Sequence, residues 1–157
     1  MTSKIKGSLR IAAVAIFVFV IIEAIHSTPR AQETSRPSRS VWDGVYTEGQ
    51  AKRGEALYSR ECARCHGSDL AGADEVPPLS GPGFLANWEG LTMDDLSERV
   101  RVSMPPNKQG KLTRQEIVDI LSYVLGFNKF PGGNGELEPK PESLKQIRIE
   151  ATKPNQK

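Results

Sequence analysis

The sequence predicts an all-α fold with three to five helices. Three stretches carry apolar residues at helical spacing, and each follows a threonine that has Gln, Asp or Glu three residues later, as in a capping box. No stretch has a trustworthy strand pattern, and there is no internal repeat. The length of 157 residues suits one domain and is too short for two sizeable cores.

The first predicted helix begins after Thr47, where Gln50 completes the capping pattern, and it runs directly into Cys62. Its expected inner face carries Ala51, Gly54, Leu57 and Tyr58. The stretch 67–83 that follows is rich in glycine and proline, so we expect an ordered loop without strand pairing.

Two further helices are predicted in the second half of the chain. One begins after Thr92 and ends at Met104, because the two prolines that follow cannot donate to a helix. The other begins after Thr113 and ends near Gly126. The apolar face of this last helix consists of Ile117, Ile120, Leu121, Val124 and Leu125.

The N-terminus has the pattern of an export leader. Basic residues precede an uncharged apolar run, 11–22, whose twelve residues rise about 18 Å as a helix and fall short of the roughly 20 that span a bilayer. Residues 1–31 are therefore expected to be a signal peptide, or an N-terminal anchor in which residues 9–25 form a membrane tether. Either form predicts a periplasmic or otherwise exported protein.

The remaining chain divides by composition. Residues 32–40 are polar and form the expected linker. Residues 41–130 hold the predicted helices and form the expected domain. Residues 131–157 are a tail rich in glycine and proline, with at most a short helix near 144–149. The role of this tail stays open, since it could wrap the site, dock a partner or be disordered.

The chemistry is concentrated in the motif Cys62-Ala63-Arg64-Cys65-His66. Two thiols three positions apart, followed at once by an imidazole, form the pattern of covalent c-type haem attachment. Each thiol can add to one vinyl group of the porphyrin, and the next residue places its imidazole beneath the iron. We therefore expect one haem c, covalently held by Cys62 and Cys65, with His66 as the proximal iron ligand.

Other uses of two cysteines fit less well. A thioredoxin-like dithiol needs a βαβ context that the sequence lacks. A zinc site needs a fourth ligand, and an iron–sulfur cluster needs four thiolates where two exist. A disulfide between Cys62 and Cys65 would close a very small loop and stabilise little. The disulfide and the redox dithiol are the main alternatives to covalent haem.

The second iron ligand is expected from a methionine. After the leader His66 is the only histidine, which excludes a second imidazole unless a partner or the leader supplies it. A thioether is a known distal ligand in electron-transfer haems and raises the reduction potential. Met104, held in a stiff segment by the prolines after it, is the favoured distal ligand. Met93 is disfavoured because Asp94 and Asp95 would place charge beside a buried ring, and an open position is the remaining alternative.

Over roughly residues 41–128 the chain resembles the class I cytochromes c. The resemblance rests on the motif from Cys62 to His66, Gly54, Tyr58, Pro78-Leu79, Met104-Pro105, Ile120 and Tyr123. It implies the cytochrome c fold around one haem, with the terminal helices crossing at Gly54 and aromatic residues packed there. It also implies that the carbonyl of Pro77 or Pro78 accepts the His66 N–H, and that Trp88 reaches a haem propionate or packs in the core.

The implied function is electron transfer without catalysis, because two filled axial positions leave no iron site for small molecules. Apolar side chains around the ring would raise the potential, and the candidates are Leu57, Leu70, Leu79, Phe84, Leu96, Val100 and Leu121. We expect a dehydrogenase or quinol-oxidising complex as donor and an oxidase or other acceptor, with the chain either a free shuttle or a dehydrogenase subunit. The alternative is a ligand-binding or peroxidase-like haem protein with an open or displaceable distal position.

Charge adds a hypothesis about docking. The whole chain has 21 basic and 19 acidic residues, a net charge of +2, which gives no indication of a nucleic-acid partner. Residues 61–98 contain eight acids and one base, whereas residues 99–115 contain five bases and no acid. The five bases are Arg99, Arg101, Lys108, Lys111 and Arg114. They bracket Met104. One interpretation is that they steer the Met104 side of the protein toward an acidic partner. The alternative is that they form a solvated surface or pair with the haem propionates.

Overall fold

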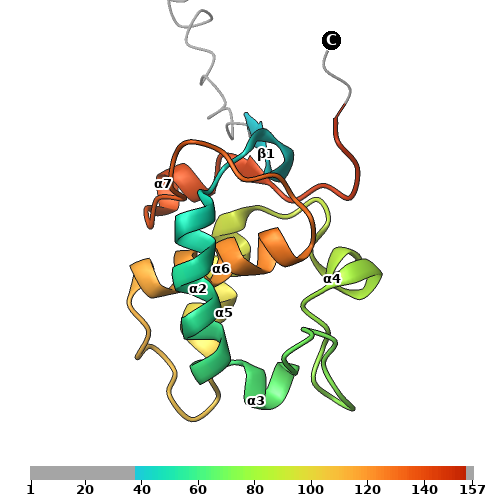
Figure 1. Ribbon diagram of the computed structural model, residues 1–157, viewed down its shortest axis with the longest axis vertical. Helices are drawn as coiled ribbons and strands as arrows, with labels where there is room; N and C mark the ends of the chain where they lie inside the picture. Colours follow the sequence, from blue (N-terminus) through green and yellow to red (C-terminus); the bar gives the residue numbers. More distant parts are fainter. Residues whose placement is uncertain (1–37, 155–157) are drawn as a thin grey trace, which may run out of the picture. The chain divides into compact units, whose positions relative to one another are not determined.

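The computed structural model describes residues 38–154 of the chain (Figure 1). In chain order its elements are β1 (Arg39–Ser40), a 3₁₀ helix (Val41–Asp43), α2 (Glu48–Glu61), α3 (Ala63–His66), α4 (Gly81–Trp88), α5 (Met93–Ser103), α6 (Arg114–Phe127), α7 (Pro141–Leu144) and β2 (Ile147–Arg148). The all-α class is confirmed. Within the described residues four helices have eight or more residues, and α3 and α7 have four each.

The three predicted helix starts are confirmed. The side chains of Thr47, Thr92 and Thr113 each accept a hydrogen bond from the backbone N–H three residues later, and Thr92 and Thr113 form complete capping boxes. At Thr47 the expected partner behaves differently. The Gln50 side chain is fully buried and forms hydrogen bonds with the backbone of Leu137 in the tail. The cap of α2 therefore consists of the Thr47 side chain without the second hydrogen bond of a capping box.

The crossing of α2 and α6 forms the centre of the fold. A Cβ built on Gly54 would lie 1.8 Å from the carbonyl oxygen of Asp119, so the two backbones meet at a point where only glycine fits. Beside it the rings of Tyr58 and Tyr123 lie 5.3 Å apart between centroids. The predicted packing of the terminal helices at Gly54 is therefore present.

Two predictions about local structure were wrong. The stretch 67–83 was expected to be loop throughout, but α4 begins within it at Gly81, where a proline at the next position suits the first turn of a helix. The tail was expected to contain at most a helix near 144–149, but α7 ends at Leu144 and a short strand follows. That strand, β2, pairs in parallel with β1, a tertiary pairing too short to leave a pattern in the sequence.

The tail folds back onto the domain. Leu137, Leu144, Ile147 and Ile149 are all buried in the main apolar core. The indole N–H of Trp42 donates to the carbonyl oxygen of Glu150 at 2.9 Å. In Figure 1, β1 and the tail lie near one end of α2, while α3 follows from its other end.

The predicted signal peptide or anchor at 1–31, the tether at 9–25 and most of the 32–40 linker lie outside the described residues. Between residues 38 and 154, none of the helices combines the length and the hydrophobicity that a membrane crossing requires.

Candidate functional site

The motif lies where α2 ends. Cys62 caps the C-terminus of α2, and its backbone N–H donates to the Tyr58 carbonyl. The short helix α3 then carries Cys65 and His66. Both cysteines are free thiols; Cys62 is half-buried, Cys65 is exposed, and the imidazole of His66 is buried. The end of one long helix thus presents both thiols and the imidazole within five residues.

The His66 ring is held by a backbone carbonyl. Its Nδ1 lies 3.0 Å from the carbonyl oxygen of Pro77, so of the two prolines considered, Pro77 makes this contact. A carbonyl can only accept, so Nδ1 carries a proton in this contact, and in the neutral imidazole the lone pair is then on Nε2. A neutral imidazole with an unprotonated Nε2 is the form that binds a metal, and the carbonyl makes it a more basic ligand.

The apolar side chains predicted to surround the ring belong to the core or pack against it. Phe84 of α4, Leu96 of α5, Leu121 of α6 and Leu70 of the intervening loop are buried. Leu57, Leu79, Val100 and Trp88 are partly buried and pack against the core. The hydroxyl of Tyr58 donates to the Gly67 carbonyl at 2.7 Å, which ties the residue after His66 to α2.

The Cys62 thiol lacks the property that a redox dithiol requires. Burial, with smaller contributions from Glu61 and Cys65, raises the pKa of Cys62 to about 11. Catalytic and redox cysteines depend on a lowered pKa, because the thiolate is the reactive species. The raised pKa makes the Cys62 sulfur a poor nucleophile for thiol–disulfide exchange.

The two methionines occupy different environments. Met93, in the first turn of α5, is completely buried in the apolar core, which is the environment of a packing residue. Met104 caps the other end of α5 and is only partly buried. The loop after Met104 reaches the motif, because Lys108 Nζ lies 3.1 Å from a carboxylate oxygen of Glu61, the residue before Cys62. In Figure 1 this loop and α3 lie at the same end of the described domain.

The residues present fit haem c. Two free thiols, an imidazole whose Nδ1 is held by a carbonyl so that Nε2 faces no such partner, and a partly exposed thioether are the donors that a covalently attached haem needs. A protein-only metal site fits less well, since residues 38–154 contain no group of three or more His, Cys, Asp or Glu side chains that could hold an ion.

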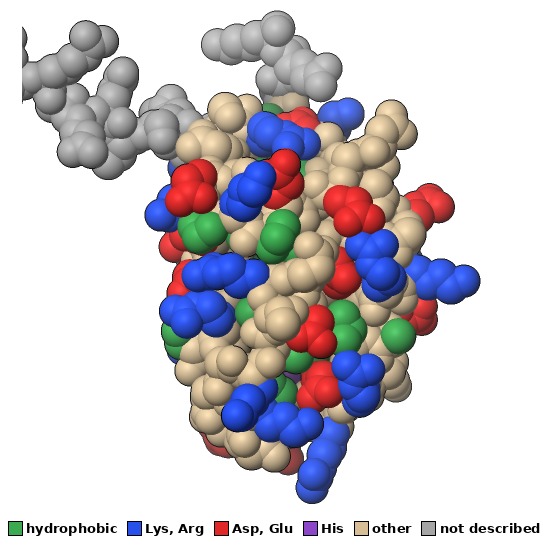
Figure 2. Space-filling model, turned by 90° about the vertical axis from the view of Figure 1, so that its left-hand side faces the viewer, with side chains coloured by type: hydrophobic (Ala, Val, Ile, Leu, Met, Phe, Trp, Pro, Cys, Tyr) green, Lys and Arg blue, Asp and Glu red, His purple; other side chains and the backbone are tan. Residues whose placement is uncertain are grey.

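Three of the five bases around Met104 have acidic partners. Arg101 and Arg114 both pair with Glu98, and Lys108 pairs with Glu61. Figure 2 shows basic and acidic side chains interspersed on one face of the protein. The uneven distribution of charge along the sequence is therefore partly balanced in space.

Comparison with known proteins gives one family. A family model described as cytochrome c oxidase, cbb3-type, subunit III, matches residues 49–124, from α2 into α6. A cbb3-type cytochrome c oxidase subunit CcoP of Rubrivivax gelatinosus is 33% identical over 82 residues, which are 50% of this chain and 26% of the relative. A thiosulfate dehydrogenase of Allochromatium vinosum is 30% identical over 90 residues, 53% of this chain and 31% of the relative.

A smaller relative is covered more completely. Cytochrome c-551 of Bacillus subtilis is 27% identical over 103 residues, 64% of this chain and 81% of the relative. The chain spans only about a quarter to a third of the length of the oxidase subunits and the dehydrogenase. No solved structure gave a significant match.

The all-α fold, the close crossing of α2 with α6 and the family match together indicate a haem-binding domain of the electron-transfer type. The match over residues 49–124 and these relatives support a class I c-type cytochrome, as the motif and the packing of the terminal helices predicted.

Sequence reasoning missed two residues that shape the site. Asn128 joins the end of α6 to the loop before α4, and Gly72 lies against the backbone of Pro77. A glycine in a loop and an asparagine at a helix end are common turn and cap residues, so neither stands out in a single sequence.

Proposed function

We propose that the chain is a monohaem cytochrome that carries single electrons between redox proteins outside the cytoplasm. Haem c, when bound, supplies an iron that alternates between the ferric and ferrous states. Cys62 and Cys65 would hold the porphyrin covalently, His66 would bind the iron through Nε2, and Met104 would be the distal ligand. The observation that carries this proposal is the Nδ1 contact of His66 with Pro77, which leaves Nε2 available.

The domain limits proposed are 41–130 for the cytochrome fold, with the 131–157 tail as an addition to it. The proposed leader at 1–31 and linker at 32–40 would export the domain and set its distance from a membrane if the leader is retained. Dehydrogenase or quinol-oxidising complexes are the proposed donors, and an oxidase or other acceptor would receive the electron. Relatives that are oxidase subunits, a dehydrogenase and a small cytochrome support both a subunit and a shuttle role.

A visible spectrum of the denatured protein tests the cofactor. Protein matured in a bacterium competent for haem attachment should keep its pigment after denaturing extraction, at one haem per chain. Replacing both cysteines with alanine should release it. Colourless wild-type protein from such a host would overturn the proposal.

Carbon monoxide distinguishes the carrier from a ligand-binding haem protein. With Met104 on the iron, the reduced protein should resist carbon monoxide, whereas Met104→Ala should bind it and change its spectrum. Met93→Leu is the matched control, because it alters a methionine that packs in the core. Carbon monoxide binding by the wild-type protein would favour the open-site alternative.

Ionic strength tests the docking hypothesis. The basic segment, residues 99–115, contains five bases. Arg101 and Arg114 form ion pairs with Glu98, and Lys108 forms one with Glu61, so part of the positive charge is neutralised. A modest basic field facing an acidic partner predicts an electron-transfer rate that falls as salt is added. A rate independent of salt would remove electrostatic steering from the proposal and leave the cofactor assignment intact.

A further inference from the structure

The loop that carries Pro77 is closed by its own backbone. The N–H of Leu79 donates to the Leu70 carbonyl at 2.8 Å, and the N–H of Gly72 donates to the His66 carbonyl at 3.0 Å. Gly72 has a φ of +71°, and a Cβ built there would lie 2.9 Å from the carbonyl carbon of Pro77. The Pro77 carbonyl therefore rests directly against Gly72, and its position depends on how the rest of the loop is held.

Asn128, at the C-cap of α6, holds that loop from outside. Its Nδ2 donates to the carbonyl of Leu79 at 2.9 Å and to that of Val124 at 2.9 Å, and its Oδ1 accepts the N–H of Gly81 at 2.8 Å. Gly81 begins α4, and the N-cap residue Ser80 makes no side-chain capping bond. One side chain from α6 thus caps α4 and fixes the residue two positions after Pro77.

We propose that Asn128 is a positioning residue for His66, acting through the Pro77 carbonyl. Asn128 fixes Leu79 and Gly81, these fix Pro77, and the Pro77 carbonyl accepts the Nδ1 proton of His66. A carbonyl that accepts this proton makes Nε2 more basic and so stabilises ferric iron. The inference rests on the proposed function, because it takes His66 as the iron ligand.

Asn128→Ala in the full, haem-loaded chain tests the inference with two measurements. The Nδ1 proton of His66, followed by NMR in the reduced protein, should exchange with solvent about ten times faster than in the wild type, because the loop opens more often. The reduction potential should rise, so that at a fixed ambient potential the ratio of ferric to ferrous protein falls by about threefold.

Thr47→Ala is the matched control. It also removes a hydrogen bond at a helix end, but at the start of α2, whereas the motif follows the end of that helix. It should lower the thermal midpoint without changing the proton exchange or the potential. If Asn128→Ala does not fold, Asn128→Ser is the milder variant, because its shorter side chain gives up the bond to Leu79 while placing no charge near the loop.

The outcomes separate this inference from the proposed function. Pigmented Asn128 variants whose His66 proton exchange and potential equal those of the wild type would overturn it, as would equal changes in Thr47→Ala. In either case the haem assignment would stand. Colourless wild-type protein would overturn the haem assignment and the inference together.

Discussion

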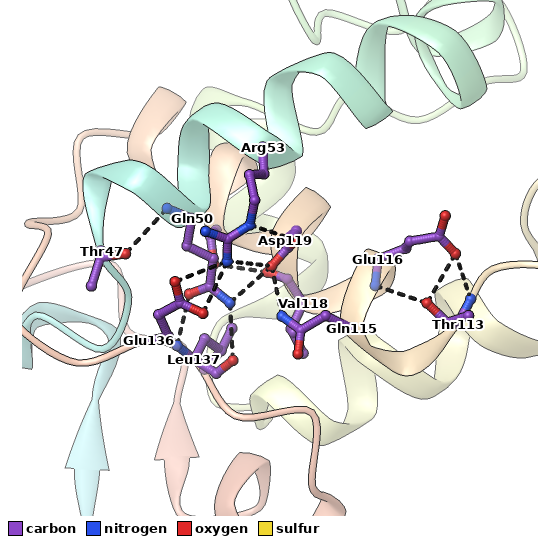
Figure 3. Close-up of polar contacts among 11 residues, drawn as sticks. Thr47, Gln50, Arg53, Thr113, Gln115, Glu116, Val118, Asp119, Glu136 and Leu137 are labelled. Carbon is purple, nitrogen blue, oxygen red and sulfur yellow. Dashed lines mark hydrogen bonds and ion pairs between the residues drawn. The ribbon is translucent and has the colours of Figure 1, made fainter.

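The crossing of α2 with α6 and the loop after His66 are held by different means. At the crossing, backbones touch at Gly54 and buried side chains join two helices to the tail, as Figure 3 shows for Gln50 and Asp119. The loop instead depends on hydrogen bonds to backbone carbonyls, and Cys65 beside it is exposed. Stability should therefore depend mainly on the crossing, and the properties of His66, the proposed iron ligand, mainly on the loop.

The crossing and the tail share one polar network. Gln50 donates to Asp119 at 3.1 Å and to the Leu137 carbonyl at 3.0 Å, while its Oε1 accepts the Leu137 N–H at 2.7 Å. Arg53 joins Asp119 of α6 to Glu136 of the tail. Since Gln50 and Leu137 are almost completely buried, a broken bond here leaves a polar group without water. The tail is thus part of the packed structure at this point.

Gly54→Ala should have the largest effect on stability. The added Cβ would meet the Asp119 carbonyl at 1.8 Å, so the helices must separate, at a cost of about 3 kcal/mol or more. Gly49→Ala on the same helix is the matched control, because its nearest neighbour would be 3.9 Å away, and it should stabilise by up to about 1 kcal/mol. Chemical denaturation measures both. Equal behaviour of the two variants would show that the crossing does not depend on close backbone contact.

Gln50→Leu should have the next largest effect. It leaves the buried N–H and C=O of Leu137 without their partner, and we expect a loss of about 2 to 4 kcal/mol together with faster proteolysis of the tail. Gln115→Ala removes one partly buried hydrogen bond to the same Asp119 and should cost about 1 kcal/mol. If Gln50→Leu is as mild as Gln115→Ala, the tail is held by its apolar side chains rather than by this network.

The sequence predicted those features whose cause is local. Helix starts follow from a threonine and the residue three positions on, and the motif from Cys62 to His66 carries its chemistry in five adjacent residues. Features that depend on contacts between distant parts of the chain have no recognisable pattern in the sequence. Gln50 was assigned to a cap although its real partner, Leu137, lies 87 residues away, and the pairing of β1 with β2 involves two residues on each strand. Distant partners of this kind cannot be inferred from the periodicity of one sequence.

Asp94 should show the smallest effect, and it lies where the tail meets α5. Its Oδ1 is buried without a hydrogen-bond partner, and its Oδ2 lies 3.9 Å from Lys145 Nζ. Burial raises its pKa above the ordinary value of 3.8; Lys145 and Arg114 oppose this shift, and nearby acids add to it. At pH values just above 3.8, the folded state therefore binds more protons than the unfolded state. The free energy of unfolding falls as the pH rises through this range.

Asp94→Asn should consequently be somewhat more stable than the wild type at about pH 7, and the difference should shrink toward about pH 3, where Asp94 is protonated in both states. Denaturation midpoints across this range measure it. Asp95→Asn is the control, because Asp95 accepts the Thr92 N–H in a capping box, so its loss should destabilise at neutral pH. A less stable Asp94→Asn at neutral pH would mean that the Lys145 contact outweighs the cost of burying the carboxylate. The polar groups between α5 and the tail would then be as well satisfied as those at the α2–α6 crossing.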